Sequence, residues 1–503
     1  MMSKGNWVKN LNIPFVVSFI ILALSAGFAA INFNYLPPVI GIFFNRPWGT
    51  AQLGYPKDLL YILGGGAMFL FVNFLLYQYF SHRRKGDLAH AISIFSLVVI
   101  FIHSLFLTNI VFKSSTKIFY LNLESLRLII PWLISFVATY LVSKKVVSLA
   151  KKYGFMEDPS KYAHPSAILT KATPRAGALA FTLVFIMSVL VFCGITKANL
   201  GIILGVAILT ILGLADDKKK YINPKARLAL QFVAAGVVVA AGIGISYIGN
   251  PFGATIMLDK VVIPIQFLGE HKLILFADIF ALIWIVFLSN AVSWSNGIDG
   301  QFAGFSGITA LVIALVSLKT AIGDNDPTQM NVARLAIITS GCAFGMTAVT
   351  WYPQKILWGF GATAVGLVIG ALSILSLSKV YIVALVLAIP LFDAIVTGVR
   401  RILQKKSPFG GDRGHLHHRL MDLGWSKPKV AMFYWLTTAI LGLFAVVGNE
   451  SDADINVIRL GVGIVCVVIL LNLIVERGKT QLLQVAKKRR LAKEPGSDES
   501  FEN

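Results

Sequence analysis

Two adjacent carboxylates, Asp216 and Asp217, end an apolar run in LTILGLADDKKK, residues 209–220. If this run is a helix, its backbone dipole is already negative at that end, so the two charges are unfavourable unless a cation compensates them. The three lysines that follow could do so as anchors at a membrane surface, and a divalent cation is the sharper alternative. Because adjacent side chains on a helix point about 100° apart, the pair cannot chelate well alone. We therefore expect a third ligand from another segment.

The segment SNAVSWSNGIDGQFAG, residues 289–304, is the expected source of that ligand. It carries Asn290, Asn296 and Asp299 beside glycines, which let a ligand approach the backbone closely. Asn, Asp and Gly are also ordinary turn residues, so a plain polar turn is the competing interpretation.

Three histidines, His415, His417 and His418, follow a basic, Gly-rich stretch in RRILQKKSPFGGDRGHLHHRL, residues 400–420. Zinc is one interpretation of HLHH, but the absence of Cys and the many cationic neighbours disfavour it. Histidine, arginine and lysine together are better suited to grip phosphate or to transfer protons. A merely basic loop would explain the Lys and Arg residues but not three histidines.

A fourth polar segment, residues 153–180, adds further basic side chains, namely Lys161, His164, Lys171 and Arg175. Alone it would be weak evidence, but the four segments together carry carboxylates, histidines and cations. Carboxylates, Mg²⁺ and cationic side chains are the equipment of phosphoryl transfer, in which catalysis is mostly positioning and neutralisation of charge.

The elements that must position these segments are apolar. Of 503 residues, 56% are hydrophobic and only 14% are charged, and the mean hydropathy is +0.75, which excludes a water-soluble globular protein. Apolar runs of about 17–25 residues can cross about 30 Å of hydrocarbon. The sequence therefore predicts an all-α, polytopic membrane helix bundle with about 14 transmembrane helices. Their approximate ranges are 12–32, 58–80, 89–112, 121–143, 176–195, 198–215, 226–247, 275–294, 301–321, 332–351, 363–376, 380–398, 429–447 and 456–476.

The net charge is +21, and the distribution of the basic residues along the chain is typical of a membrane protein. With the N-terminus in the cytoplasm, the basic connections fall on the cytoplasmic side, as the positive-inside rule expects, and acidic connections such as residues 323–327 fall outside. This topology predicts a multi-pass protein of the cell inner (plasma) membrane whose four polar segments face the cytoplasm, and it argues against a nucleic-acid partner. Cys193, Cys342 and Cys466 lie inside predicted spans, so neither a disulfide framework nor a Cys-based zinc site is expected.

Polar chemistry is unevenly distributed along the chain. The first three spans carry little of it, which predicts an N-terminal membrane extension of three helices over residues 1–120. A functional membrane core is expected over residues 121–480, followed by a cytoplasmic tail, residues 481–503, that is first basic and then acidic. Residues 248–272 combine Gly, Pro and β-branched side chains, which predicts a small external β-hairpin.

The four polar segments, in this order, resemble the polyprenyl-phosphate N-acetylhexosamine-1-phosphate transferase family, glycosyltransferase family 4. Its paired aspartates look like Asp216 and Asp217, and its Asn-Ala-x-x-x-x-Asp-Gly-x-Asp-Gly motif looks like residues 290–300. Its His-x-His-His loop looks like residues 415–418, in the form similar to the bacterial branch that transfers GlcNAc-1-phosphate to undecaprenyl phosphate. The resemblance covers about residues 120–450 and makes residues 121–480 a sugar-phosphate transferase core.

The resemblance implies Mg²⁺-dependent transfer of an N-acetylhexosamine 1-phosphate from a UDP-sugar to undecaprenyl phosphate, with release of UMP. This would be the first membrane step of a cell-envelope polysaccharide such as lipopolysaccharide or teichoic acid. The implied catalytic residues are Asp216, Asp217, Asp299 and His415, of which Asp217 and Asp299 would hold Mg²⁺, with Mn²⁺ as an alternative. The implied substrate-binding residues are Asn290, Asn296, Lys171, Arg175, Arg413, His417 and His418. The implied partners are the polyprenyl-phosphate lipid and the UDP-sugar, with a homodimer as a further expectation.

Several positions depart from the family pattern. Asn296 stands where the first Asp of Asp-Gly-x-Asp is common, Ser293 replaces a frequent Asn, and Ala178 replaces a Gly; residues 358–362, WGFGA, occupy the place of a Met-Gly-Asp-x-Gly motif. Three alternatives therefore stay open: a phospho-MurNAc-pentapeptide transferase, a degenerate homologue that only binds lipid phosphate, and a transporter. A transporter usually keeps ionisable groups near the bilayer midplane, whereas the predicted spans place most of them near helix ends.

Overall fold

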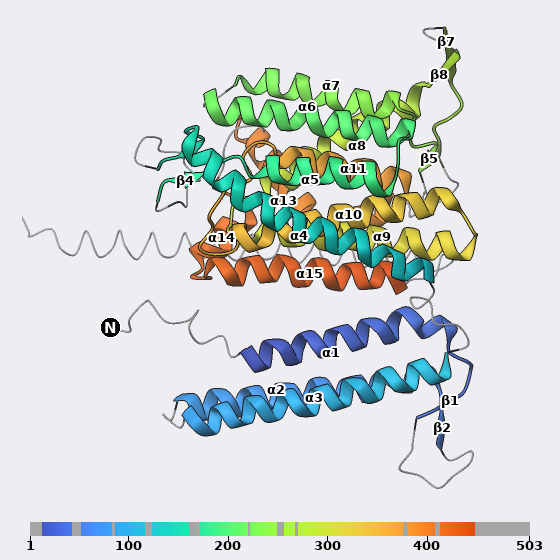
Figure 1. Cartoon of the computed structure of the whole chain (residues 1–503), viewed down its shortest axis with the longest axis vertical. Helices are drawn as coiled ribbons and strands as arrows, with labels where there is room; N and C mark the ends of the chain where they lie inside the picture. The colour runs from blue at the N-terminus through green and yellow to red at the C-terminus, as the bar shows by residue number, and fades with distance from the viewer. Residues whose placement is uncertain are drawn as a thin grey trace, which may run out of the picture. The chain divides into compact units, whose positions relative to one another are not determined.

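The computed structural model of this chain is predominantly helical (Figure 1). It describes residues 13–42, 52–82, 86–115, 123–159, 169, 171–219, 222–248, 256–266, 270–376, 380–407 and 413–447. The chain divides into two compact units, Met1–Leu126 and Arg127–Asn503.

The described residues of the first unit form three α-helices, with short elements between the first two. Its elements are α1 (Ile13–Asn32), η1 (Phe33–Tyr35), β1 (Ile40–Gly41), β2 (Leu53–Gly54), η3 (Pro56–Asp58), α2 (Leu59–His82) and α3 (Gly86–Ser114). The strands pair antiparallel, and α3 packs against both α1 and α2, as Figure 1 shows. Ala29, Leu107 and Ile110 belong to the buried core of this unit.

In its described ranges, the second unit contains helices α4 to α15 and three short antiparallel strand pairs. Its elements are α4 (Leu123–Lys152), β3 (Met156–Glu157), β4 (Thr173–Pro174), α5 (Gly177–Phe192), α6 (Lys197–Lys219), α7 (Pro224–Ala240), β5 (Tyr247–Ile248), β6 (Ile256–Met257), β7 (Val262–Gln266), β8 (Glu270–Ile274), α8 (Leu275–Trp294), α9 (Gln301–Gly323), α10 (Pro327–Thr350), α11 (Ala362–Leu375), α12 (Val380–Val386), α13 (Ala388–Leu403), α14 (Leu416–Asp422) and α15 (Lys427–Val447). Helices α7 and α10 each begin with Pro after a capping side chain, Asn223 and Asp326, which accepts backbone N–H groups of the first turn.

Helices α9, α10 and α11 form much of the interior of the second unit. The most apolar windows of α9 and α10 are 67% and 78% buried, against 28% for α4, which therefore offers more of its surface to lipid. Buried polar side chains link neighbouring helices. The hydroxyls of Thr182 and Thr210 lie 2.6 Å apart between α5 and α6, and Nε1 of Trp284 donates to Ser373 across 2.9 Å between α8 and α11. Such bonds are the usual polar contacts between helices in a membrane.

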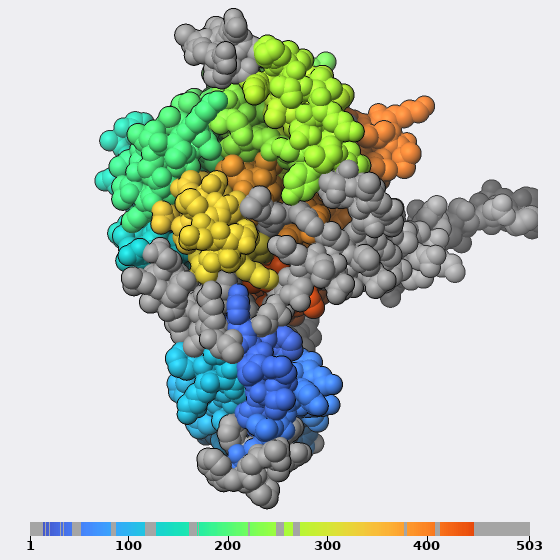
Figure 2. Space-filling view, turned by 90° about the vertical axis from the view of Figure 1, so that its right-hand side faces the viewer, coloured from blue at the N-terminus to red at the C-terminus, as the bar shows by residue number. Residues whose placement is uncertain are grey.

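The connections of the second unit gather at its two ends (Figure 1). Strand β4 and helix α14 lie at one end, whereas β5, β7 and β8 lie at the other. Figure 2 looks onto the end with the hairpins, where the turn between α9 and α10 is visible in yellow. The polar segments predicted from the sequence belong to the end with β4 and α14.

The protein is an integral membrane protein. Within the described ranges, 8 helices are long and apolar enough to cross a membrane, or up to 9 if a bent pair counts as one span. Helices α5 and α11 are apolar but shorter. The all-α bundle with small strands is confirmed, whereas the count of about 14 spans is not; the predicted span at 456–476 lies outside the described residues, as do Cys466 and the tail 481–503.

The span expected over residues 380–398 is not one continuous helix. Helices α12 and α13 meet at an angle of 84° across Leu387. Pro390 explains the position of the break, because it has no N–H to bond the carbonyl four residues earlier, that of Val386, the last residue of α12. The hairpin expected over residues 248–272 is present in a different form, as two pairs, β5 with β6 and β7 with β8.

Candidate active site

Asp216 and Asp217 lie buried in the last turn of α6, and their carboxylates have different partners. Oδ1 of Asp216 accepts a hydrogen bond from the backbone N–H of Ile222 at 3.0 Å and forms an ion pair with Nε of Arg227 at 2.9 Å. The Nε–H of Arg227 donates to the carbonyl of Ile222, also at 2.9 Å. Lys218 does not supply the compensating charge, since its Nζ donates to the carbonyl of Tyr153 at 2.5 Å. The cation that the sequence required at Asp216 is therefore an arginine from the first turn of α7.

Asp217 pairs with a second arginine, which precedes α5. Its Oδ1 accepts from Nε of Arg175 at 2.6 Å and from the backbone N–H of Phe360 at 3.2 Å. Nη1 of Arg175 also pairs with Glu157. Burial alone would lower the pKa of Arg175, but the two carboxylates outweigh it and raise that pKa above its ordinary value, so the guanidinium stays charged and bridges β3 to the end of α6.

Asp299 lies in the turn between α8 and α9 and is also buried. Its Oδ1 accepts from Nζ of Lys427 at 3.0 Å, and its Oδ2 accepts from the backbone N–H of Gln354 at 3.2 Å. Lys427 is the first residue of α15. The third carboxylate predicted from the sequence thus also pairs with a cation from a distant element, and we call Asp216, Asp217 and Asp299 the carboxylate set.

One segment, residues 351–361, touches two members of the carboxylate set. Its backbone donates from Gln354 to Asp299 and from Phe360 to Asp217. Gly359 has a φ of +70°, and a Cβ there would overlap the carboxylate of Asp217, so this close approach requires glycine. The WGFGA departure from the family pattern therefore lies directly against Asp217.

His415 is held by a carboxylate that the sequence analysis did not assign to the site. Nδ1 of His415 lies 2.9 Å from Oδ2 of Asp393, a residue of α13 that is only 1% exposed. The other oxygen, Oδ1, accepts the backbone N–H of Leu416 at 2.7 Å. His415 is the N-cap of α14, so Asp393 fixes both its ring and the start of that helix.

The rings of His415, His417 and His418, here called the histidine cluster, pack together. The first two are stacked with centroids 5.6 Å apart and planes 4° apart, and the last two lie 4.3 Å apart. Burial, with His418 and His415 as further causes, lowers the pKa of His417 well below its ordinary value, and burial chiefly lowers the pKa of His418 to about 4. His417 and His418 are therefore neutral at pH 7 and would meet a phosphate as hydrogen-bonding groups rather than as cations.

The histidine cluster meets the segment 289–304. A Cβ on Gly297 would overlap Nε2 of His417, so the imidazole rests on the backbone of that glycine. The ring of Trp294 lies 6.5 Å from that of His415. The structure thus brings together two of the polar segments, 289–304 and 400–420, as the sequence analysis expected.

The two predicted asparagines have different surroundings. Asn290 exchanges hydrogen bonds with Gln231 of α7, at 3.2 and 2.8 Å, and its amide also donates to the carbonyl of Val286 at 2.8 Å. Asn296 is half-buried in the turn after α8, and its backbone N–H donates to Ser293. Their roles in binding substrate remain predictions.

Two predicted substrate-binding cations lie at the surface. Lys171 is exposed, and Arg413 is exposed with a long contact of 3.5 Å to Asp422. Lys161 and His164 lie outside the described residues. Arg175 is thus the predicted substrate-binding cation that the structure places against a carboxylate of the set.

The carboxylate set has oxygen donors of the type that Mg²⁺ takes. No three His, Cys, Asp or Glu side chains in the described part of the chain group as a metal site. Mg²⁺ commonly uses one or two carboxylates and completes its shell with water and substrate phosphates. Asp217 and Asp299, both buried and both bonded to the segment 351–361, fit that description, although an ion would replace Arg175 or Lys427 at the carboxylate.

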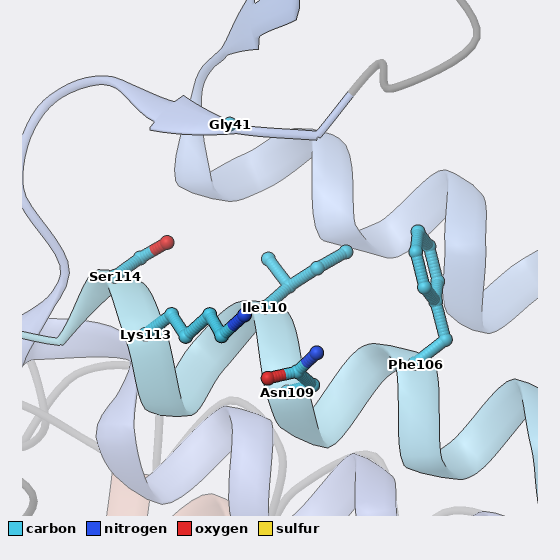
Figure 3. Close-up of a pocket in the computed structure, with 6 residues that line it drawn as sticks. All are labelled: Gly41, Phe106, Asn109, Ile110, Lys113 and Ser114. Atoms are coloured by element: carbon cyan, nitrogen blue, oxygen red, sulfur yellow. The ribbon is translucent and has the colours of Figure 1, made fainter.

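A hollow of about 330 Å³ lies within the first unit (Figure 3). It is lined by Gly41, Phe106, Asn109, Ile110, Lys113 and Ser114, and in the close-up the side chains come from α3 beneath the strand that carries Gly41. The carboxylate set and the histidine cluster belong entirely to the second unit.

Sequence reasoning missed the partners of the predicted residues. Glu157, Arg227, Asp393 and Lys427 were not assigned to the site. Asp393 had a usable signal, because a carboxylate within an apolar run is costly unless it has a partner. The other three lie in polar connections or at helix ends, where a charge is unremarkable, and nothing in their spacing indicates a partner.

The central part of the second unit is similar to known proteins. Residues 199–377 match the model of Glycosyl transferase family 4. A probable undecaprenyl-phosphate N-acetylglucosaminyl 1-phosphate transferase of Bacillus subtilis is 26% identical over 335 residues, which cover 65% of this chain and 86% of the relative. A decaprenyl-phosphate N-acetylglucosaminephosphotransferase of Mycolicibacterium smegmatis is 25% identical over 364 residues, which cover 66% of this chain and 85% of the relative. A phospho-N-acetylmuramoyl-pentapeptide-transferase of Nautilia profundicola is 26% identical over 345 residues, which cover 64% of this chain and 93% of the relative.

Proposed function

We propose that the chain transfers N-acetylglucosamine 1-phosphate from UDP-GlcNAc to undecaprenyl phosphate and releases UMP, because residues 199–377 match the model of Glycosyl transferase family 4. The relatives from Bacillus subtilis and Mycolicibacterium smegmatis carry names that describe such a transfer to a polyprenyl phosphate. The product would be the lipid-linked sugar that starts a cell-envelope polysaccharide.

One observation carries the proposal. Two buried carboxylates from separate helix ends, Asp217 and Asp299, bond to the same short segment, and each also pairs with a cation, Arg175 or Lys427. A diphosphate with its metal brings both negative oxygens and positive charge. It can therefore satisfy the cations and the carboxylates at once, which is the exchange that a phosphoryl-transfer site needs.

We propose that Asp217 and Asp299 hold Mg²⁺, for which Mn²⁺ is an alternative. When bound, the ion would neutralise charge on the departing UMP. The chain's own groups do the rest. Arg175 and Lys427 bind phosphate oxygens once they leave their carboxylates, and His415 stabilises charge on the sugar phosphate through its ring nitrogen.

Asp216 is proposed to orient the acceptor phosphate. An oxygen of that phosphate attacks the β-phosphorus of the donor, the bond from this phosphorus to the oxygen shared with the α-phosphate breaks, and UMP leaves with the electron pair. Asn290, Asn296, Lys171, Arg413, His417 and His418 are proposed to contact the nucleotide and sugar. Because the basic connections lie beside this site, we place it on the cytoplasmic side of the plasma membrane.

A reconstituted assay tests the proposal. Purified full-length protein is incubated with Mg²⁺, undecaprenyl phosphate and UDP-[¹⁴C]GlcNAc, and both UMP release and extraction of label into the lipid phase are measured. We expect both, and we expect EDTA to abolish both until Mg²⁺ is restored. Parallel reactions with UDP-GalNAc and with UDP-MurNAc-pentapeptide distinguish donors; transfer only from the pentapeptide donor would favour the reaction named for the Nautilia profundicola relative.

Two outcomes would overturn the transferase proposal. One is the absence of UMP release with every donor from protein that is folded and binds undecaprenyl phosphate, which is the behaviour of a degenerate homologue. The other is an Asp217→Ala variant that is as active as its parent.

A further inference from the structure

We propose that Asp393 is a positioning residue that fixes the ring of His415, so that Nε2 is the nitrogen presented to the substrate phosphates. The proposal deepens the proposed function and rests on it, because it assigns a partner to a histidine of the same site. Asp393 touches no substrate in this scheme; it acts through His415.

The geometry of Asp393 leaves little freedom to the ring. Both carboxylate oxygens are used, Oδ2 by Nδ1 of His415 at 2.9 Å and Oδ1 by the N–H of Leu416 at 2.7 Å. A carboxylate only accepts hydrogen bonds, so the proton of the pair must sit on Nδ1 of His415. In the neutral ring, Nε2 then carries the lone pair, and in the protonated ring it carries a proton that it can donate.

His417 packs against the face of the His415 ring. His417 lies parallel to His415, with planes 4° apart, and is itself buried against the backbone of Gly297. The stack limits tilting of the His415 ring, whereas the hydrogen bond from Asp393 fixes its rotation about the Cβ–Cγ bond. The side chain of His415 remains 12% exposed, while that of its partner Asp393 is 2% exposed.

The loop that precedes His415 has support of its own. Arg419 and Arg400 both donate to the carbonyl of Gly414, at 2.9 and 3.3 Å. Loss of the Asp393 carboxylate would therefore free the ring without releasing the backbone. Asp393 itself is placed by α13, which starts anew after the break at Leu387.

A purely structural role makes a different prediction, because Asp393 also caps α14. Asparagine caps helices about as well as aspartate, so Asp393→Asn keeps an acceptor for the N–H of Leu416. Its amide NH₂ would face Nδ1–H of His415, donor against donor. A positioning role predicts a loss in Asp393→Asn, and a capping role predicts none.

The matched control is Asp278→Asn in α8. Asp278 is also a carboxylate that accepts a backbone N–H, that of Ile274 at 2.9 Å. It belongs to the first turn of α8, directly after β8, which lies at the other end of the second unit (Figure 1). We expect Asp393→Asn to lower kcat by roughly 10- to 100-fold, with a smaller change in KM, as for other residues that orient a functional histidine. Asp278→Asn should stay within twofold of the parent, and thermal stability should change little in either variant.

A double-mutant cycle shows whether Asp393 acts through His415. We expect Asp393→Asn to cost less than twofold in a His415→Ala background, because the ring that it positions is gone. Full additivity, or an Asp393→Asn variant as active as its parent while the parent turns over UDP-GlcNAc, would overturn the inference and leave the transferase proposal intact.

A spectroscopic arm decides the inference even if the parent has no transferase activity. The protein is labelled with [¹⁵N]histidine, and the His415 signals are assigned by their loss in His415→Gln. In the spectra of the neutral ring we expect the protonated-nitrogen shift at Nδ1 in the parent and its loss in Asp393→Asn. A proton on Nε2 in the parent would overturn the proposal whatever the activity.

Discussion

The carboxylate set and the histidine cluster both contain buried ionisable side chains, but the two regions stabilise them in opposite ways. Asp216, Asp217 and Asp299 each pair with an arginine or lysine from another element. In the histidine cluster, Asp393 pairs with His415, while His417 and His418 are neutral. The first arrangement balances permanent charges, whereas the second keeps most of its groups uncharged.

The two regions differ in whether a bound substrate could replace the partners of their charged groups. A buried ion pair is strongly destabilised when one partner leaves without replacement, but an incoming diphosphate and cation would replace both partners together. The Asp393–His415 pair also uses a backbone N–H and a stacked ring, so it has no need of substrate to be satisfied. In our proposal the carboxylate set changes partners when substrate binds, whereas the histidine cluster keeps its geometry.

The largest effect is expected from breaking the carboxylate set at Asp217. Asp217→Asn removes the charge that pairs with Arg175 and, in our proposal, one ligand of Mg²⁺. We expect UMP release to fall by about 10³-fold, as when a group that stabilises transition-state charge is lost. Asp324→Asn, which changes an exposed carboxylate at the start of the α9–α10 turn, is the control. Retention of a tenth of the parent's rate by Asp217→Asn would contradict the assignment.

The second effect tests the cation partner. Lys427→Met removes the cation that pairs with buried Asp299 and leaves the N–H of Gln354 as a donor to its carboxylate. We expect a loss of about 3–4 kcal/mol in the free energy of unfolding, seen as a drop in the apparent melting temperature in detergent. Lys427→Arg should restore most of it, and Lys225→Met, at an exposed lysine of α7, should not change it. An unchanged melting temperature in Lys427→Met would mean that Asp299 is satisfied without its cation.

The third effect comes from the neutral histidines and depends on pH. Folding lowers the pKa of His418 from 6.5 to about 4, so between these values the unfolded chain binds more protons than the folded one. Stability is therefore fully present above pH 6.5 and falls as the pH is lowered towards 4, by at most about 3 kcal/mol. We expect the melting temperature to fall over this range in the parent and to fall less in His418→Gln.

The control for the pH series is His90→Gln, which changes an exposed histidine of α3. Its pH profile should parallel that of the parent. A His418→Gln profile as steep as the parent's would show that the acid loss arises elsewhere and would weaken the contrast between the two regions.

Local sequence was enough to predict the helices. Every apolar run predicted before residue 448 overlaps a helix, and the run 380–398 overlaps two, because length and hydropathy are local properties. The bend between α12 and α13 was not predicted, although Pro390 lies beside it. Proline is tolerated in the first turn of a helix, so its presence in the sequence does not by itself predict a bend. The charged segments of the site also stood out, since charge is rare in this chain.

The pairings within the site could not be predicted in the same way. Arg227 is close to Asp216 in sequence, but Lys427 reaches Asp299 across α9 to α14, and Asp393 reaches His415 only because α13 and α14 fold together. Which cation pairs with which carboxylate depends on how the helices pack, and the spacing of residues along the chain does not predict that packing. The contact between Gly297 and His417 is of the same kind.

The smallest effect is expected from that contact. Gly297→Ala places a Cβ where Nε2 of His417 now lies, so the buried imidazole must move and the stack on His415 is disturbed. Crowding of this kind costs about 1–3 kcal/mol, and we expect a few-fold fall in kcat together with a lower melting temperature. Gly236→Ala is the matched control, because a Cβ there meets nothing within 4 Å in the middle of α7, where alanine stabilises a helix by up to about 1 kcal/mol. If both variants behave like the parent, His417 is free to move, and the histidine cluster does not keep the fixed geometry that sets it apart from the carboxylate set.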